Sequence, residues 1–137
     1  MAGYQGEFEA LAGVFETGWA NQTPIAWENL DFAPPDPMTS WVRFSVLPGE
    51  AFYASTGAPG NNLIRHPGLI VVQVFVPQNA GGLSALDLAD DAAGVFRDYR
   101  SGGIRCGAPW ITAIRPSARD GWHQVNVNIP FVRDEVL

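Results

Sequence analysis

The chain has little of the chemistry that metal centres, redox sites and disulfide frameworks require. In 137 residues it contains no lysine, a single cysteine (Cys106) and only two histidines, His66 and His123. One cysteine cannot form an intramolecular disulfide, and two distant histidines without a cysteine pair lack the spacing of a zinc site. The sequence therefore predicts no metal, no cofactor and no oxidising compartment.

Positive charge is also scarce. The eight basic residues are all arginine, and the net charge is −6. A chain of this balance without a basic cluster is a poor nucleic-acid binder, because counterion release needs several cations converging on phosphates. The use of arginine alone fits two interpretations: a GC-rich coding bias, or the preference for arginine at protein interfaces, where its planar fork binds carboxylates.

Long hydrophobic runs are missing as well. The longest, Leu69 to Val76, is broken by Gln73 and is far too short to cross a bilayer. The first residues carry neither a basic segment nor an apolar core, so we expect no signal peptide and a soluble intracellular protein. What is abundant is apolar and aromatic side chain: 47% of residues are hydrophobic, which is enough for a single domain over residues 1–137.

The first predicted element is an amphipathic helix near the N-terminus. Its apolar residues recur at steps of three and four, the spacing of one helix face: Tyr4, Phe8, Leu11, Ala12, Phe15 and Trp19. Glu7 and Glu9 lie near its start, where the helix dipole favours acidic side chains. Gly18 is expected to end it.

Alternation of apolar and polar residues predicts a strand with one buried face from Trp41 to Pro48. Before it, Pro24 to Asn29 is expected to be extended, and the proline-rich residues 33–37 hold the chain away from helix. After it we expect a short return strand at residues 50–54. The turn formers at 55–62 predict a mobile loop.

Three further strand regions are predicted. The first, Leu63 to Val76, is interrupted at Pro67-Gly68, and its almost continuously apolar second half indicates a central strand with both faces covered. The second, Ile104 to Ile114, is broken at residues 107–109. In the third, Trp122 to Val132, valine and isoleucine alternate with glutamine and asparagine.

A second helix is predicted between the long strand and these last two strand regions. Ser84 is the expected N-cap, Asp87 completes a capping box, and Leu83 with Leu88 forms a hydrophobic staple. Residues 101–103 are expected to end the helix. The whole pattern predicts an α+β domain in which two α-helices pack on a mainly antiparallel, twisted sheet.

Reactive side chains do not form a recognisable catalytic set. Cys106 lies in a predicted strand, where a lone cysteine behaves as a small buried hydrophobe rather than as a nucleophile with His123 as its base. Ser117, Asp120 and His123 are close in sequence, but catalytic triads are defined by geometry and not by spacing. Residues 57–60 lack the Gly-Lys-Ser/Thr ending of a phosphate loop. We therefore predict no catalytic residue and no enzyme.

Two oppositely charged segments form the candidate interface. Asp87, Asp90 and Asp91 lie on the polar face of the second helix, and Arg115 and Arg119 flank a short loop. Complementary charged patches on one molecule are what a head-to-tail, ring-closing interface needs. The ordinary alternative for the three aspartates is a solvated helix face.

The order of these elements resembles the small tail-terminator proteins of long-tailed, lambda-like bacteriophages. The resemblance extends over nearly the whole chain. It is carried by the first helix and by five later segments: Pro24-Ile25-Ala26-Trp27-Glu28-Asn29, the strand Trp41 to Pro48, the strand Leu69 to Pro77, the Ala/Asp-rich helix to Phe96, and the closing strand from Asp120 to Val127.

The resemblance implies a structural assembly protein of a phage or prophage, with no catalytic residue. Members of that family are implied to form hexameric rings on the finished tail tube, ending its growth and presenting a surface to the head-side connector. The implied partners are other copies of the chain, the tail tube protein and the head-completion or connector protein, with monomers or weak oligomers when free. The implied location is the host bacterial cytoplasm during assembly and then the head–tail junction of the virion.

The residues alone leave one other function open. A small α+β ligand-binding module or enzyme subunit would use the loop from Arg115 to Arg119 to hold a small ligand.

Overall fold

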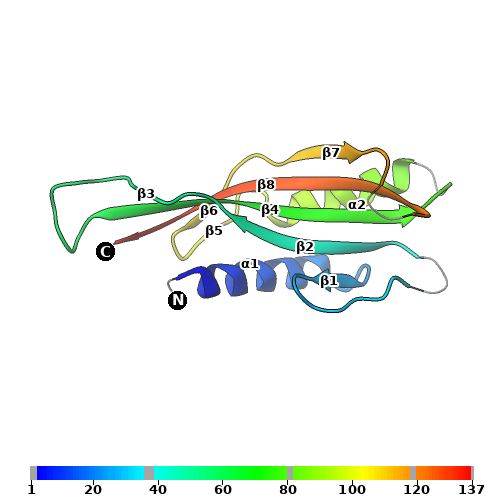
Figure 1. Cartoon of the computed structure of the whole chain (residues 1–137), viewed down its shortest axis with the longest axis horizontal. Coiled ribbons are helices and arrows are strands. Elements are labelled where there is room, and N and C mark those ends of the chain that lie inside the picture. Colours follow the sequence, from blue (N-terminus) through cyan, green and yellow to red (C-terminus); the bar gives the residue numbers. More distant parts are fainter. Residues whose placement is uncertain (1–2, 36–38, 80–81, 118–119, 137) are drawn as a thin grey trace.

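The computed structural model describes residues 3–35, 39–79, 82–117 and 120–136. Within them, two helices cover one face of a single eight-stranded sheet, so the predicted α+β class is confirmed (Figure 1). The elements are α1 (Gly3–Trp19), β1 (Ile25–Trp27), β2 (Trp41–Pro48), β3 (Phe52–Tyr53), β4 (Leu63–Pro77), α2 (Gly82–Val95), β5 (Arg100–Ser101), β6 (Ile104–Cys106), β7 (Trp110–Ile114) and β8 (Trp122–Val136).

The sheet is antiparallel except at one edge. Its strands run in the order β1-β2-β4-β8-β6-β5, with β3 paired to the outer part of β4 and β7 paired to β8 beside β6. Only the pair β1–β2 is parallel among the strands described. The predicted break at residues 107–109 is confirmed, because β6 and β7 pair with different parts of the same strand, β8.

The two central strands, β4 and β8, are fifteen residues long and pair along their whole length. The predicted interruption at Pro67-Gly68 is wrong. The Pro67 carbonyl accepts a hydrogen bond from the Gly49 amide at 2.8 Å, so its backbone edge faces the gap between the end of β2 and the start of β3, where its missing N–H deprives no strand of a donor. At Gly68 a Cβ atom would lie 2.4 Å from the Phe131 ring, so only glycine fits.

The outer parts of β4 and β8, together with β3, continue beyond the helices as an arm (Figure 1). The predicted return strand is present but only two residues long. Residues 54–62 form the exposed tip of the arm. Hydrogen bonds fold this tip back on itself, from the Leu63 amide to Ser55 Oγ at 2.7 Å and from the Ala58 amide to Asn62 Oδ1 at 3.0 Å.

The main core lies between the helices and the sheet. The rings of Phe15 on α1, Phe44 on β2 and Phe96 after α2 stack on one another, with centroids 5.1 to 6.4 Å apart. On the opposite face of the sheet, Trp41 stacks on Phe75 at 4.2 Å in a smaller cluster. The second half of β4 is therefore covered on its helix face, whereas on the opposite face Phe75 is buried but Val71 and Gln73 stay partly exposed, so the expected cover of both faces is only partly present.

The start of the chain corrects two expectations about α1. Gly18 does not end the helix, which continues to Trp19, and the chain then turns through left-handed conformations at Ala20 and Asn21. Gly18 lies instead at the contact with α2, where a Cβ atom would come within 2.9 Å of Val95 Cγ1. Glu7 is not at an exposed helix start, because it is 2% exposed and bonded to β8.

The predicted ends of α2 are also wrong. The helix begins at Gly82, so Ser84 lies inside its first turn, and Leu83 is 78% exposed and cannot form a staple. The helix ends at Val95, and Asp98 has a left-handed φ of 57°. Residues 102–103 form the tight turn between β5 and β6, which is the geometry that a Gly-Gly pair favours.

Candidate functional site

The three predicted interface aspartates lie together on the outer face of α2. Asp87, Asp90 and Asp91 are exposed, while the alanines of the opposite face are fully buried against the sheet. Leu83 and Leu86 lie on the same outer side, and 78% and 44% of their surfaces are exposed. We call Leu83, Leu86, Asp87 and Asp90 the α2 stripe. Their spacing of three and four residues places them in one row.

The predicted arginine loop is described only in part. Arg115 is exposed just after β7, whereas Arg119 lies outside the described residues. A hollow of about 190 Å³ beside Arg115 is lined by Gln78, Ile114, Pro116, Ser117, Trp122 and His123. Ligand pockets usually measure ~300–1,000 Å³, so this hollow gives a ligand-binding role little support.

A buried ion pair, which the sequence pattern did not reveal, ties α1 to the central strands. Arg133 on β8 is 3% exposed, and its Nε donates to Glu7 Oε1 on α1 at 3.0 Å. Glu135 lies 3.3 Å from the same guanidinium and 2.6 Å from His66 Nε2. Burial raises the pKa of Glu135, but the His66 hydrogen bond and the Arg133 charge outweigh it, so the net shift is downward. The cluster is placed to fix α1 on the sheet.

A second charged cluster lies on the other face of the sheet, at the base of the arm. Asp134 accepts two hydrogen bonds from Arg65, at 2.8 and 3.1 Å, and one from Arg105 at 2.8 Å. These hydrogen bonds and charges lower the pKa of Asp134 to about 2, and the hydrogen bond from Arg65 is the largest cause. Two guanidinium groups share one carboxylate, so this cluster keeps a net positive charge in an acidic chain.

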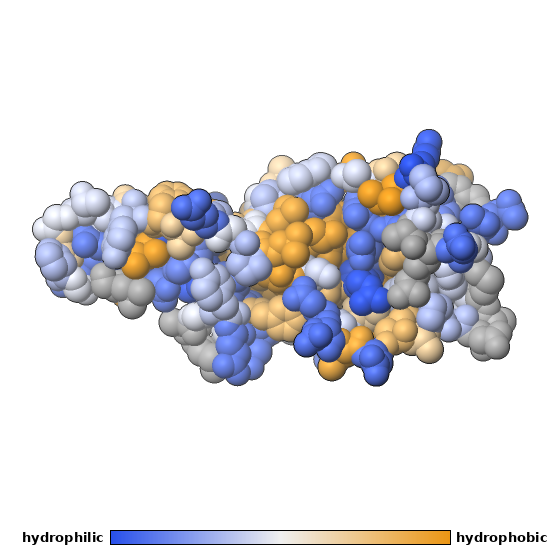
Figure 2. Space-filling model, in the orientation of Figure 1, coloured by the Kyte–Doolittle hydropathy of each residue, from blue (hydrophilic) through white to orange (hydrophobic). Residues whose placement is uncertain are grey.

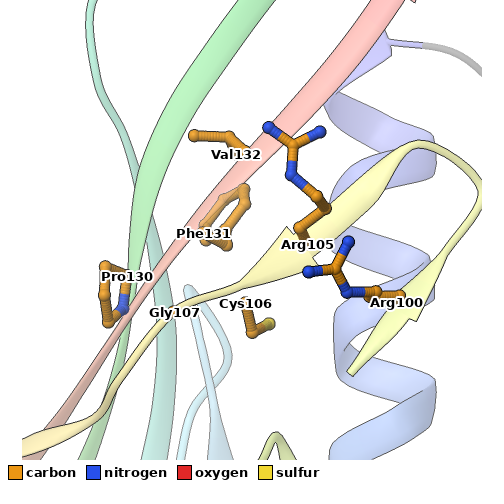
Figure 3. A pocket seen from close by; sticks show the side chains of 7 residues that line it. All are labelled: Arg100, Arg105, Cys106, Gly107, Pro130, Phe131 and Val132. Atoms are coloured by element: carbon orange, nitrogen blue, oxygen red, sulfur yellow. The ribbon is translucent and has the colours of Figure 1, made fainter. Parts of the chain in front are cut away.

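Next to this cluster is a hollow of about 240 Å³. Arg100 and Arg105 extend from β5 and β6 along one side, and Pro130, Phe131 and Val132 of β8 line the other (Figure 3). We call it the arginine hollow. It is also lined by Cys106 and Gly107. Burial raises the pKa of the Cys106 thiol to about 11, so it stays protonated at neutral pH and makes a poor nucleophile.

The sheet face opposite the helices shows apolar surface gathered over the middle strands, with the arm extending to one side (Figure 2). Leu47 on β2 and Trp110 on β7 are about half exposed. Within the described residues, no three His, Cys, Asp or Glu side chains are grouped as a metal site would need. None of the helices described there is long and apolar enough to span a membrane.

A family model for the phage tail terminator protein matches residues 8–131. The chain belongs to the phage tail terminator family. The match extends from α1 to the middle of β8 and confirms the resemblance inferred from the order of elements. No curated protein matches this chain. One solved structure, which carries no functional name, shares 22% identity with it over 94% of both chains, with a TM-score of 0.61. That likeness shows a shared fold.

The charged clusters of this chain could be found only in part from its sequence. Arg100 and Arg105 flank Gly102-Gly103, and a Gly-Gly turn between two short strands sets these arginines opposite each other. The same glycines also fit the end of a helix, so the sequence alone does not reveal the pair. No local pattern connects Glu7 with Arg133, which are 126 residues apart.

Proposed function

We propose that this terminator caps the tube of a phage tail as a ring of identical subunits, ends tail growth and prepares the junction with the head. The family match over residues 8–131 carries the proposal. The proposed ring is a hexamer on the tail. Its partners are the tail tube protein on one side and the head-completion or connector protein on the other, and the free subunit is a monomer or weak oligomer. The protein is encoded by a phage or prophage gene, and assembly takes place in the host cytoplasm.

The exposed charges support a ring. A closed ring of identical subunits needs two different, complementary surfaces on each copy. Asp87, Asp90 and Asp91 supply a negative surface, and Arg115, with Arg119, supplies the positive surface expected from the sequence. The role is structural, with no turnover and no cofactor, and the protonated thiol of Cys106 fits that role.

Tail length tests this function. A phage lacking the protein is expected to make over-long or headless tails, visible by electron microscopy, and the wild-type gene should restore normal ones. Tails of normal length and normal infectivity without the protein would contradict the proposal.

A charge reversal tests the surface. Arg115→Glu with Arg119→Glu should keep the fold and give the same tail defect, whereas Arg97→Glu, another exposed arginine, serves as the control. Normal tails in the double variant would remove these two arginines from the interface and leave the capping role standing.

A further inference from the structure

Arg100 and Arg105 form a like-charged pair that the fold itself does not neutralise. They are direct partners in the register of β5 and β6, so their side chains lie on the same face. Like charges directly opposite each other destabilise an antiparallel pair. Arg105 shares Asp134 with Arg65, and Arg100 has no carboxylate partner among the residues that the structure describes. The pair is therefore suited to an anion from outside the subunit.

The surroundings of this pair favour a carboxylate that has apolar side chains beside it over a phosphate. Pro130 and Val132 give the arginine hollow partly exposed apolar surface, with the largely buried Phe131 between them in the strand, and an apolar wall gains nothing from a nucleic-acid backbone. The hollow is one positive site on a chain of net charge −6, which would repel a long polyanion. An acidic segment with exposed leucines has the matching chemistry.

The α2 stripe is such a segment, and it belongs to the same chain. It presents Leu83 and Leu86 beside Asp87 and Asp90 on one exposed row. We propose that the α2 stripe of one copy docks in the arginine hollow of the next. The leucines would cover the apolar wall, and Asp87 and Asp90 would pair with Arg100 and Arg105, which at this contact take the place of Arg115 and Arg119 as the positive surface.

The two surfaces are placed for a head-to-tail contact. Arg105 is the register partner of Val132, which points away from the helix-covered face. The α2 stripe points outward on the helix side, opposite the buried alanines. The two surfaces lie on opposite faces of the sheet and cannot meet within one subunit, so the contact joins different copies head to tail, and its repetition closes a ring when the rotation between copies leads back to the first copy. The proposal deepens the proposed ring and rests on it.

A photo-crosslinker in place of Leu86 tests the contact in the full chain, both free at high concentration and in assembled tails. We expect intermolecular cross-links to residues 100–107 or 130–132, located by mass spectrometry. The same group in place of Leu30, which is 65% exposed elsewhere, should give none there. No cross-link from Leu86 to these residues in either preparation overturns the proposal, whatever the tail lengths are.

Charge exchange tests the arginine pair by sedimentation. Arg100→Glu and Asp90→Arg should each weaken self-association by about tenfold. Combining them restores the opposite charges across the contact and should recover most of the loss, while Arg97→Glu should have no effect. Equal association in all variants with unchanged unfolding midpoints overturns the proposal. The proposal is also overturned if the protein binds a DNA duplex, Arg100→Glu abolishes that binding, and self-association of the variant is unchanged.

Discussion

Phe96 shows how a single residue can hold both helices on the sheet. It is 1% exposed and stacks on Phe15 and Phe44, in the core that contains Val72 and Val74. Phe96→Ala removes these contacts and leaves a cavity, so it should lower the free energy of unfolding by ~3–5 kcal/mol in urea titrations. A loss below about 1 kcal/mol would mean that the site is not part of the rigid core.

Asp134 predicts a pH dependence. Its pKa falls from 3.8 to about 2 on folding, chiefly through the hydrogen bond from Arg65. A carboxyl group with a lowered folded pKa stabilises the fold fully above its unfolded pKa, and loses that effect as the pH falls through the folded value. Stability should therefore drop between about pH 4 and pH 2, together with the smaller effect of Glu135, whose pKa is also lowered.

The Asp134→Asn variant isolates this effect. It should be less stable than the wild type at pH 7, because Arg65 and Arg105 lose their shared partner. Its stability should also fall less steeply between pH 4 and pH 2. If the unfolding free energies of the two proteins, measured by urea titration, fall in parallel between pH 4 and pH 2, the assignment to Asp134 is wrong.

The contact between α1 and β8 depends on the buried ion pair of Glu7 and Arg133. Glu7→Gln leaves the Arg133 guanidinium without its partner on α1, and breaking a buried ion pair costs ~3–5 kcal/mol. Glu9 is exposed on the same helix, so Glu9→Gln is a matched control and should change the unfolding free energy by less than ~0.5 kcal/mol. Equal effects of the two changes would show that the buried pair is energetically silent.

The packing of α1 on α2 can be tested with two glycines of one helix. Gly13 has open space around it, so Gly13→Ala should stabilise the protein by ~0.5–1 kcal/mol through helix propensity. Gly18→Ala would push into Val95, whose branched side chain is stiff in a helix, so that gain should be lost or reversed. Adding Val95→Ala should make Gly18→Ala favourable again. If both glycines respond alike to alanine by thermal unfolding, the helices are not in contact there.

At this scale the sequence predicts periodic elements well and their ends poorly. The inner faces of α1 and α2 and the alternation of β2 and β8 follow from burial, which repeats at every turn or second residue. Element ends depend on single tertiary contacts. Position 18 is a glycine because Val95 leaves no room for a Cβ atom there. Pro67 stays inside β4 because its backbone faces a gap between two partner strands.

The arm is the feature that extends the subunit beyond its core. Residues 55–62 at its tip touch few other parts of the chain, and we expect them to become ordered only on assembly. Amide exchange at 55–62 should be fast in the free protein and slow in assembled tails. β4 residues 70–76 should be protected in both. Slow exchange of the tip in the free subunit would contradict this prediction.

The position of β8 in the sheet has a consequence for synthesis. Of the described strands it is the last to be synthesised, yet it lies between β4 on one side and β6 and β7 on the other. Until residues 122–136 emerge, β4 lacks its fifteen-residue partner strand, and Glu7 lacks its ion-pair partner Arg133. A nascent or truncated chain therefore exposes the unpaired edge of its most apolar strand. Only copies that include residues 122–136 can form this fold, so chains that stop before them are excluded from assembly.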